Sequence, residues 1–251
     1  QYVAARLLNM QLRKEVWGYG DQPTDFLLFL ERNVDNAVYD PTILEKWDAE
    51  NIELLGKYIN HGRDDLFTYA GLQQMIDKYL VKNRSTGRIY ETPQFAYMCI
   101  AMCLFDNIAE VKKAYDCYST FKINLPTPIM AGVRTNIRQF SSCVLVDVDD
   151  NLDGIFSSIH AVGKYTARRA GIGLNIGRMR PMNSPIRGGE VIHTGVIPYL
   201  KNFESAVKST SQNGLRGGSA TVHVPFWHFE IEDILVLKNN AGTDDNRVRK
   251  L

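Results

Sequence analysis

Hydrophobic residues recur at three- and four-residue spacing through the first half of the chain, which predicts amphipathic helices. We expect these helices over residues 2–17, 24–34, 41–58, 66–81, 93–105 and 108–118. In the third of them Asp40 is placed to act as the cap, and Pro41 occupies the first helical position, where a missing N–H costs nothing. A turn at 83–87 and a short strand at 88–91 interrupt the series. The first half is therefore predicted to be mainly helical.

The pattern changes after residue 123. Two prolines in residues 124–128 fix φ and disfavour helix around Thr127, so we expect an extended link there. Apolar runs then alternate with amphipathic segments, which predicts strands at 140–148, 171–176 and 219–224 and helices at 153–169, 193–209 and 229–237. Such alternation favours a parallel α/β sheet or barrel, although three strands do not close a barrel.

These patterns predict two domains, a mainly helical one over residues 1–123 and an α/β one over residues 124–251. The first helix starts without a capping residue and the last segment ends without a stop signal. We therefore expect both ends of the chain to lie inside a longer protein.

The stretch 138–153 carries the most chemistry. Its apolar run Val144–Val148 is expected to be a buried strand. The run is preceded by Ser141, Ser142 and Cys143 and followed by an acidic turn, and Asn151 or Asp153 is expected to cap the next helix. In an arbitrary protein, a cysteine in this setting is more often a core residue than a reactive one. The stretch by itself leaves both interpretations open.

Composition excludes several classes of protein. The formal net charge of +1 gives no general attraction to nucleic acid or to an anionic membrane. No apolar run approaches the ~20 residues of a membrane span, and no signal peptide opens the chain. The four cysteines are too few for a disulfide scaffold, and the Cys99/Cys103 pair has core spacing with no second pair that would complete a zinc site. We expect a reduced, cytoplasmic protein with no metal site.

Two glycine-rich loops are candidates for phosphate binding. Residues 178–189 hold three arginines among prolines and glycines, and residues 211–219 hold one. Arginine forks and backbone N–H groups suit a phosphate, although solvated surface arginines are the alternative. The Gly171–Gly177 segment fails the dinucleotide fingerprint because its third glycine comes one residue late. We expect both loops at the carboxyl ends of the strands, where α/β sheets bind ligands, and this predicts a nucleotide site. The five histidines show no ligand spacing, so core or surface roles are expected for them.

Many short motifs resemble, in the same order, the large (catalytic) subunit of aerobic class I ribonucleotide reductase. They lie at residues 66–70, 77–81, 119–123, 125–130, 132–135, 138–143, 169–173, 186–190, 193–195, 216–218 and 237–240. The resemblance implies a helical N-terminal domain, with the tail end of an ATP-cone region at its start. It implies that the first strands of a ten-stranded α/β barrel follow.

The resemblance implies reduction of ribonucleoside diphosphates to deoxyribonucleotides for DNA synthesis by a thiyl-radical mechanism. Carried over by position, Cys143 is one of the two thiols that supply electrons. The positions for substrate binding are Thr127, Ser142, Gly171, Arg216 and Gly217. The positions for an allosteric effector, a deoxynucleoside triphosphate or ATP, are Asp150, Asn151, Leu152, Arg180, Ile186 and Arg187.

The resemblance also implies partners. A metal-containing small subunit would supply the radical, so no cofactor is expected on this chain itself. Thioredoxin or glutaredoxin would return the thiols to the reduced state, and the helices after Asp153 and His193 would form a dimer interface. The remaining catalytic residues would come from the C-terminal remainder of the large subunit, and the chain alone is expected to be inactive.

Two positions depart from the family pattern, because Asn213 replaces a common glycine and Gly154 a common serine. By the same resemblance, we expect most of the ATP-cone to be missing from residues 1–251, so overall activity control is not implied for them. The alternative function is a nucleotide-binding regulatory module that retains only the effector site. A vitamin B12-dependent reductase is a lesser alternative.

Overall fold

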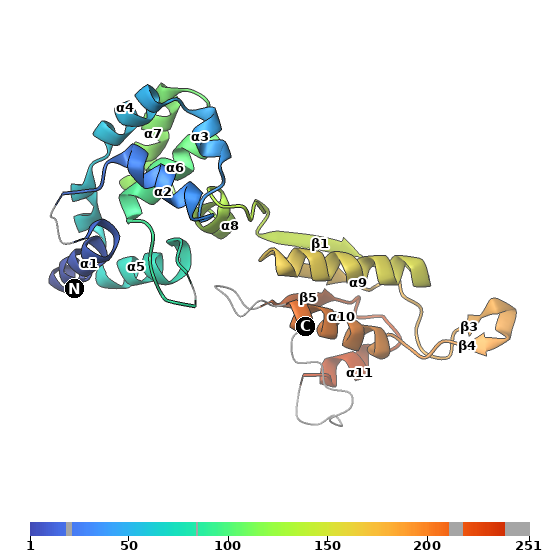
Figure 1. Cartoon of the computed structure of the whole chain (residues 1–251). Coiled ribbons are helices and arrows are strands. Elements are labelled where there is room, and N and C mark those ends of the chain that lie inside the picture. Colours follow the sequence, from blue (N-terminus) through green and yellow to red (C-terminus); the bar gives the residue numbers. More distant parts are fainter. Residues whose placement is uncertain (19–21, 84, 211–217, 239–251) are drawn as a thin grey trace. The chain divides into compact units, whose positions relative to one another are not determined.

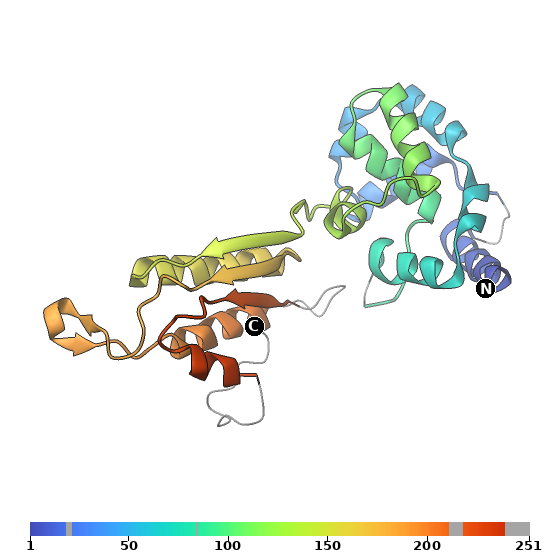
Figure 2. The ribbon, with the colours of Figure 1, turned by 180° about the vertical axis from the view of Figure 1, so that it is seen from behind.

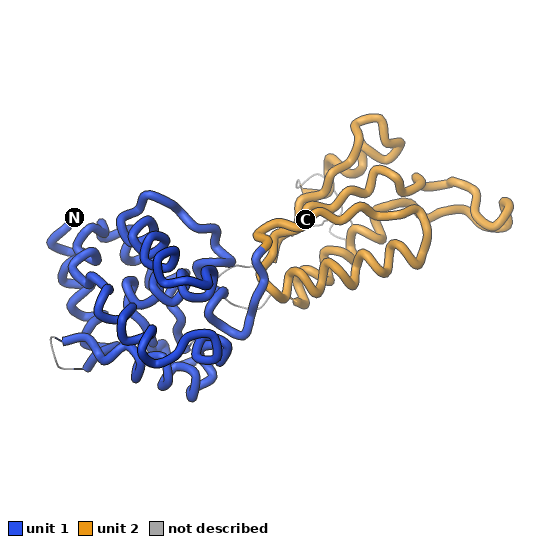
Figure 3. The backbone as a smooth tube through the Cα atoms, turned by 90° about the horizontal axis from the view of Figure 1, so that it is seen from above, with its two compact units in different colours: residues 1–140 blue, residues 141–251 orange. Residues whose placement is uncertain are grey.

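The structure is a computed structural model that describes residues 1–18, 22–83, 85–210 and 218–238 (Figure 1). The chain divides into two compact units, residues 1–140 (unit 1) and 141–251 (unit 2) (Figure 3). This division comes later than the expected 123/124 boundary. The reason is that residues 124–140 belong with the helical unit, where they add a helix and a buried ion pair.

Unit 1 is helical, as the hydrophobic periodicity predicts. Its α-helices are α1 (Tyr2–Trp17), α2 (Phe26–Asp35), α3 (Thr42–Lys46), α4 (Ala49–Tyr58), α5 (Tyr69–Gln74), α6 (Pro93–Leu104), α7 (Ile108–Ser119) and α8 (Thr127–Gly132). A 3₁₀ helix, η1 (His61–Leu66), and a π-helix, η2 (Met75–Tyr79), complete it. Helix α6 lies at the centre, since ten of its residues, Pro93 to Met102, are buried.

Several local predictions for unit 1 are wrong. The helix expected over 41–58 is broken at Trp47, whose φ of −124° and ψ of 125° are extended. The helix expected over 66–81 begins only at Tyr69 and ends in the π-helix η2. The link expected around Thr127 is instead the start of α8, because Pro128 lies in the first helical turn, where proline is tolerated. The strand expected at 88–91 is reduced to one bridge, between Lys82 and Ile89.

A buried ion pair joins residues 124–140 to the rest of unit 1. Arg134 and Glu91 are both fully buried, and the Arg134 Nε donates to Glu91 at 2.8 Å. Arg134 also donates to the carbonyls of Met130 and Tyr79, and the Tyr39 hydroxyl donates to the same Glu91 carboxylate. Every polar group of the pair is therefore satisfied, which is what allows two charges to be buried.

Unit 2 contains a parallel three-stranded sheet in the order β1-β2-β5, which confirms the predicted α/β architecture. Its strands are β1 (Cys143–Asp147), β2 (Gly171–Asn175), β3 (Pro185–Ile186), β4 (Val191–Ile192) and β5 (Ala220–His223). Its helices are α9 (Leu152–Ala167), α10 (Ile197–Thr210) and the short α11 (Ile231–Val236). The strands β3 and β4 form a separate antiparallel hairpin.

Helices α9 and α10 pack against each other and lie on one face of the sheet, as Figures 1 and 2 show from opposite sides. The covered face supplies the core residues Ile172, Leu174 and Ala220. The opposite face is open within the described part of unit 2, and Leu145 is 81% exposed there. The expectation that Val144–Val148 is a fully buried strand is thus wrong for one of its faces. Only Val148, just past the strand, is fully buried.

Candidate functional site

The amino ends of β1 and β2 bring three predicted substrate and redox residues together. Cys143 is paired with Gly171 in the parallel register, and the Gly171 N–H donates to the carbonyl of Ser142 at 2.8 Å. Ser142 and Cys143 point to opposite faces of the strand, so this backbone bond is what places the serine beside Gly171. The same edge continues to β5, where the Ile172 N–H donates to the carbonyl of Ser219 at 3.3 Å.

The four cysteines have different environments, and only Cys143 is exposed. Its side chain lies on the open face of the sheet, because Cys143 and Leu145 are two residues apart in β1 and therefore point to the same face. Cys99 is fully buried and Cys103 is half-buried; burial raises the pKa of both thiols, that of Cys103 to about 11. A thiolate forms less readily in those two sites, so Cys143 is the better placed of these thiols for redox chemistry.

The predicted effector residues lie at the other end of β1. The Arg180 backbone N–H donates to Asp150 Oδ1 at 2.9 Å, and its Nε donates to Oδ2 at 2.7 Å. Arg178 makes similar pairs, with Asp147 at 3.0 Å and Asp149 at 3.6 Å. The acidic turn after β1 and the arginines after β2 are therefore in direct contact, which the sequence predicted only as proximity.

Asn151 and Leu152 begin helix α9. The Asn151 side chain accepts from the Gly154 N–H at 2.8 Å, so Asn151 is the cap and Asp153 lies in the first turn. Leu152 is 58% exposed. The start of α9 therefore presents an exposed apolar side chain beside the Asp150–Arg180 pair.

Ile186 and Arg187 lie at the tip of the β3–β4 hairpin, which projects from unit 2 in Figure 1. Ile186 pairs with Val191, and Arg187 starts the turn with a φ of 50°. Gly188 and Gly189 follow with φ values of 71° and 95°, which glycine adopts without strain. Arg187 is exposed and lies, like Arg180, in the segment that connects β2 to α10.

The predicted redox residue Cys143 and the acidic turn with the predicted effector residues Asp150 and Asn151 thus lie at opposite ends of β1, separated by the ~13 Å length of a five-residue strand. Of the two glycine-rich loops expected at the carboxyl edge, residues 178–189 follow the carboxyl end of β2, whereas residues 211–217 lie outside the described residues. Gly218 and Ser219 lead into β5 at its amino end, because parallel strands all enter the sheet at the same edge. Arg216 and Gly217 lie outside the described residues. Thr127 belongs to unit 1, where it is the first residue of α8.

Sequence reasoning missed a row of polar residues across the carboxyl edge. The register places Asp147, Asn175 and His223 side by side, and the Asn175 side-chain amide donates to Asp147 Oδ1 at 2.8 Å. A cavity of about 550 Å³ lies against this edge, lined by Asn175, Gly177, Arg178, Val222, His223, Val224 and Pro225. Parallel pairing of the expected strands was the signal that could have revealed the row.

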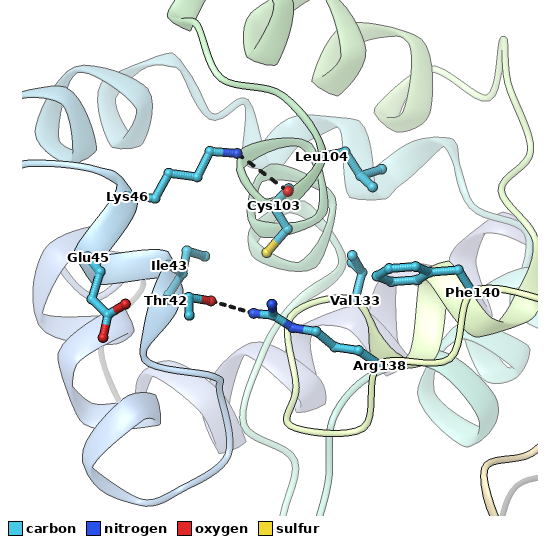
Figure 4. Close-up of a pocket in the computed structure, with 9 residues that line it drawn as sticks. All are labelled: Thr42, Ile43, Glu45, Lys46, Cys103, Leu104, Val133, Arg138 and Phe140. Carbon is cyan, nitrogen blue, oxygen red and sulfur yellow. Dashed lines mark hydrogen bonds between the residues drawn. The ribbon is translucent and has the colours of Figure 1, made fainter.

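A second cavity, of about 560 Å³, lies in unit 1 (Figure 4). The figure shows Lys46 directed at the carbonyl of Cys103, at 3.4 Å, and Arg138 bonded to Thr42. Both cations already have acidic partners, Asp106 for Lys46 at 2.8 Å and Asp40 for Arg138 at 2.9 Å. The cavity therefore has no uncompensated positive charge from these two side chains.

Two further absences concern only the described part of the chain. No group of three or more His, Cys, Asp or Glu side chains there is arranged to hold a metal ion. None of the helices that the structure describes is long and apolar enough to cross a membrane.

Comparison with known proteins adds the family. Residues 65–138 match the family model of the ribonucleotide reductase all-alpha domain, and residues 141–251 match that of the ribonucleotide reductase barrel domain. The chain is 50% identical over 257 residues to ribonucleoside-diphosphate reductase 1 subunit alpha of Escherichia coli K12. It is 50% identical over 256 residues to the subunit alpha of Enterobacteria phage T4, and 32% identical over 255 residues to that of Helicobacter pylori J99.

All of the chain is covered in these matches, with 34%, 34% and 32% of the respective relatives. The chain thus spans about a third of the length of the curated relatives it matches. The two family models meet between residues 138 and 141, at the division between the compact units.

Proposed function

Because the chain belongs to the large-subunit family of ribonucleotide reductases, we propose that it contributes one reducing thiol and the effector site to an enzyme that reduces ribonucleoside diphosphates. The observation that carries this proposal is the exposed Cys143 thiol, paired in register with Gly171 at the amino edge of the sheet. A thiol that must reach a sugar has to stand on an uncovered face, and this one does.

The proposed reaction exchanges the ribose 2′-hydroxyl for hydrogen. Cys143 and a second thiol, from the remaining length that the relatives have, give up two electrons and two protons and become a disulfide. The hydroxyl leaves as water and C2′ gains a hydrogen, so atoms and electrons balance. A thiyl radical would open the reaction by abstracting the 3′ hydrogen and would return that hydrogen to C3′ at its end. A metal-containing small subunit would supply the radical. Thioredoxin or glutaredoxin then reduces the disulfide in the cytoplasm, where thiols are kept reduced.

The substrate would lie along the amino edge. The Ser142 hydroxyl and the backbone at Gly171 can bond the polar oxygens of a ribose or phosphate. A glycine suits that contact because no Cβ keeps the substrate from the backbone. Thr127, Arg216 and Gly217 complete the proposed substrate set.

The effector would bind at the carboxyl edge. In the structure Arg180 is held by Asp150, and Arg187 stands exposed at the hairpin tip. A triphosphate attracts both guanidinium groups, and the carboxylate of Asp150 can then accept from a sugar hydroxyl. Asn151, Leu152 and Ile186 would line the base and ribose. Effector and substrate groups share strand β1, which supports a coupling between them that must be reciprocal.

A dimer would form through helices α9 and α10, as the family resemblance implies. Helix α9 carries Phe156, 55% exposed, and Tyr165, 36% exposed. Apolar side chains exposed on a helix in this way support a contact surface for a second copy.

The decisive experiment is a single substitution with a matched control. The chain is completed by the remaining length of its relatives, combined with a small subunit, and assayed for CDP reduction with thioredoxin. Cys143→Ser is expected to abolish turnover, whereas Cys117→Ser, at a half-buried thiol of unit 1, should retain it. Turnover by the Cys143→Ser protein would refute the assigned role.

The second candidate function is a regulatory module that only binds nucleotides. It is favoured by the contacts of Arg180, Asp150 and Asn151, which are complete within this chain. Calorimetry with deoxynucleoside triphosphates separates the two candidates. Effector binding without CDP reduction after assembly would favour the module.

A further inference from the structure

A buried carboxylate joins two distant parts of unit 2. Glu230, just before α11, is only 4% exposed. One of its oxygens accepts from the Met182 N–H at 2.9 Å, and both accept from the Val196 N–H, at 3.1 and 3.2 Å. Backbone N–H groups are good partners for a buried carboxylate because they satisfy its charge without a second ion.

His228 adds a third connection to the same region. It is 7% exposed, and its Nε2 lies 3.1 Å from the carbonyl of Met179. Its Nδ1 accepts from the backbone N–H of Glu230 at 3.2 Å. This pattern assigns the proton to Nε2, which donates to Met179. The turn itself is closed by the His228 N–H, which donates to the carbonyl of Pro225 at 2.9 Å.

Gly195 makes room for the carboxylate. Its φ is +94°, and a Cβ built there would lie 2.4 Å from Glu230 Oε1. Any other residue would push the carboxylate away as well as strain the backbone. Val196, the next residue, precedes the first turn of α10, where the helix dipole also favours a negative charge.

These bonds hold together the two ends of the long loop between β2 and α10. Met179 and Met182 lie where the chain leaves β2 for the hairpin, and Val196 lies where it returns to α10. The residues between them include Arg180, Ile186 and Arg187, three of the six proposed effector positions. His228 and Glu230 come from the segment that directly follows β5.

We propose that His228 and Glu230 form a latch that positions the loop between β2 and α10 (residues 176–196, the effector loop) and connects it mechanically to strand β5. The expectation that this latch affects nucleotide binding rests on the proposed effector site. Glu230 acts as a positioning residue, because it contacts the loop backbone and not the arginine side chains. The bonds to the Met179 carbonyl and the Met182 N–H hold the backbone on both sides of Arg180. A nucleotide that shifts the Arg180 backbone would therefore also displace the latch.

The test compares Glu230→Gln with Glu232→Gln in the whole 251-residue chain, since Glu232 is exposed two residues further on. In Glu230→Gln a neutral amide replaces the carboxylate and presents its NH₂ group to a backbone N–H, so one bond is lost. Backbone amide exchange at Met182 and Val196 should accelerate at least about tenfold in Glu230→Gln. Amides of β2 should keep their wild-type rates, and Glu232→Gln should behave as wild type throughout.

Affinity for dTTP, measured by calorimetry, provides the functional measurement. Glu230→Gln is expected to weaken dTTP binding about tenfold, without a comparable change in exchange of the sheet. Unchanged dTTP affinity together with faster exchange at Met182 would overturn the positioning role. A wild-type chain that fails to bind dTTP would instead refute the effector site, while the exchange rates would still decide whether the latch exists.

The wild-type protein offers an independent check if Glu230→Gln does not fold. One carboxylate accepts from both backbone amides. The hydrogen bonds of Met182 and Val196 should therefore break together, and the two amides should show equal protection against exchange. A Met182 amide that exchanges freely while Val196 stays protected would overturn the proposal.

Discussion

Two buried titratable groups in unit 1 should make its stability depend on pH in opposite directions. His61 lies edge-on between Trp17 and Phe95, with ring centroids 5.0 Å from each. Burial, with a smaller contribution from the charge of Arg13, lowers the pKa of His61 to about 4. Burial also raises the pKa of Asp64 to about 6, although bonds from Gln94 and Arg13 act in the opposite direction.

The two groups change the free energy of unfolding in opposite directions as the pH rises. The unfolded chain binds a proton at His61 more readily than the folded chain, so rising pH between 4 and 6.5 stabilises the fold. The folded chain binds a proton at Asp64 more readily than the unfolded chain, so rising pH between 3.8 and 6 destabilises the fold. A pKa displaced by just over two pH units corresponds to ~3 kcal/mol over the whole titration. Between pH 4 and 6 each group contributes ~2 kcal/mol, and the two contributions nearly cancel.

Single substitutions should expose each contribution. In Asp64→Asn the free energy of unfolding of unit 1 should increase by ~2 kcal/mol, relative to wild type, as the pH rises from 4 to 6. In His61→Gln it should decrease by ~2 kcal/mol over the same range. Glu50→Gln, at an exposed acid of α4 that contributes to neither shift, is the control and should follow the wild-type curve.

Urea unfolding followed by tryptophan fluorescence is a suitable assay. The chain has three tryptophans, and in a Trp227→Phe background the two that remain, Trp17 and Trp47, both report on unit 1. Variants whose pH dependence matches that of wild type would show that these groups titrate normally in the fold, and the assigned pKa directions would then be wrong.

Three other substitutions test separate parts of the structure. Arg134→Leu leaves the Glu91 carboxylate buried without its ion partner and should destabilise unit 1 by ~3–5 kcal/mol in urea unfolding; a loss below ~1 kcal/mol would contradict the buried pair. Gly132→Ala places a Cβ 2.7 Å from the Ile137 carbonyl oxygen, so a destabilisation of ~1–3 kcal/mol is expected, and a melting temperature equal to that of wild type would refute the contact. Arg180→Lys removes the planar fork and should weaken dTTP binding about tenfold in calorimetry, whereas unchanged affinity would remove Arg180 from the effector site.

Local sequence was enough to predict the elements whose signals are local. Asn151 caps α9 because its short side chain can reach the Gly154 N–H three residues on. The alternation of apolar strands with helices predicted a parallel sheet, since a parallel connection needs a crossover. The same reasoning placed Cys143 and Gly171 on adjacent strands, while the roles of both residues came from family resemblance.

Tertiary contacts overrode the local pattern elsewhere. Residues 41–58 read as one helix, yet the chain turns at Trp47 because the indole is buried and donates to the carbonyl of Met102 at 3.1 Å. The open face of β1 was equally invisible in the sequence. An apolar strand is compatible with one covered face or two, and α9 and α10 cover the same one because both crossovers have the same handedness.

The sequence by itself determined the helical character of unit 1, the parallel α/β character of unit 2, and the types of residue at each strand end. Only the tertiary structure decided that Cys143 lies at the amino edge of the sheet and that Arg178 and Arg180 lie at its carboxyl edge. It alone joined Glu230 to Met182, 48 residues away, and to Val196, 34 residues away. The physical reason is range: capping and periodicity act within a few residues, whereas a buried carboxylate takes whichever N–H groups the packed chain brings to it.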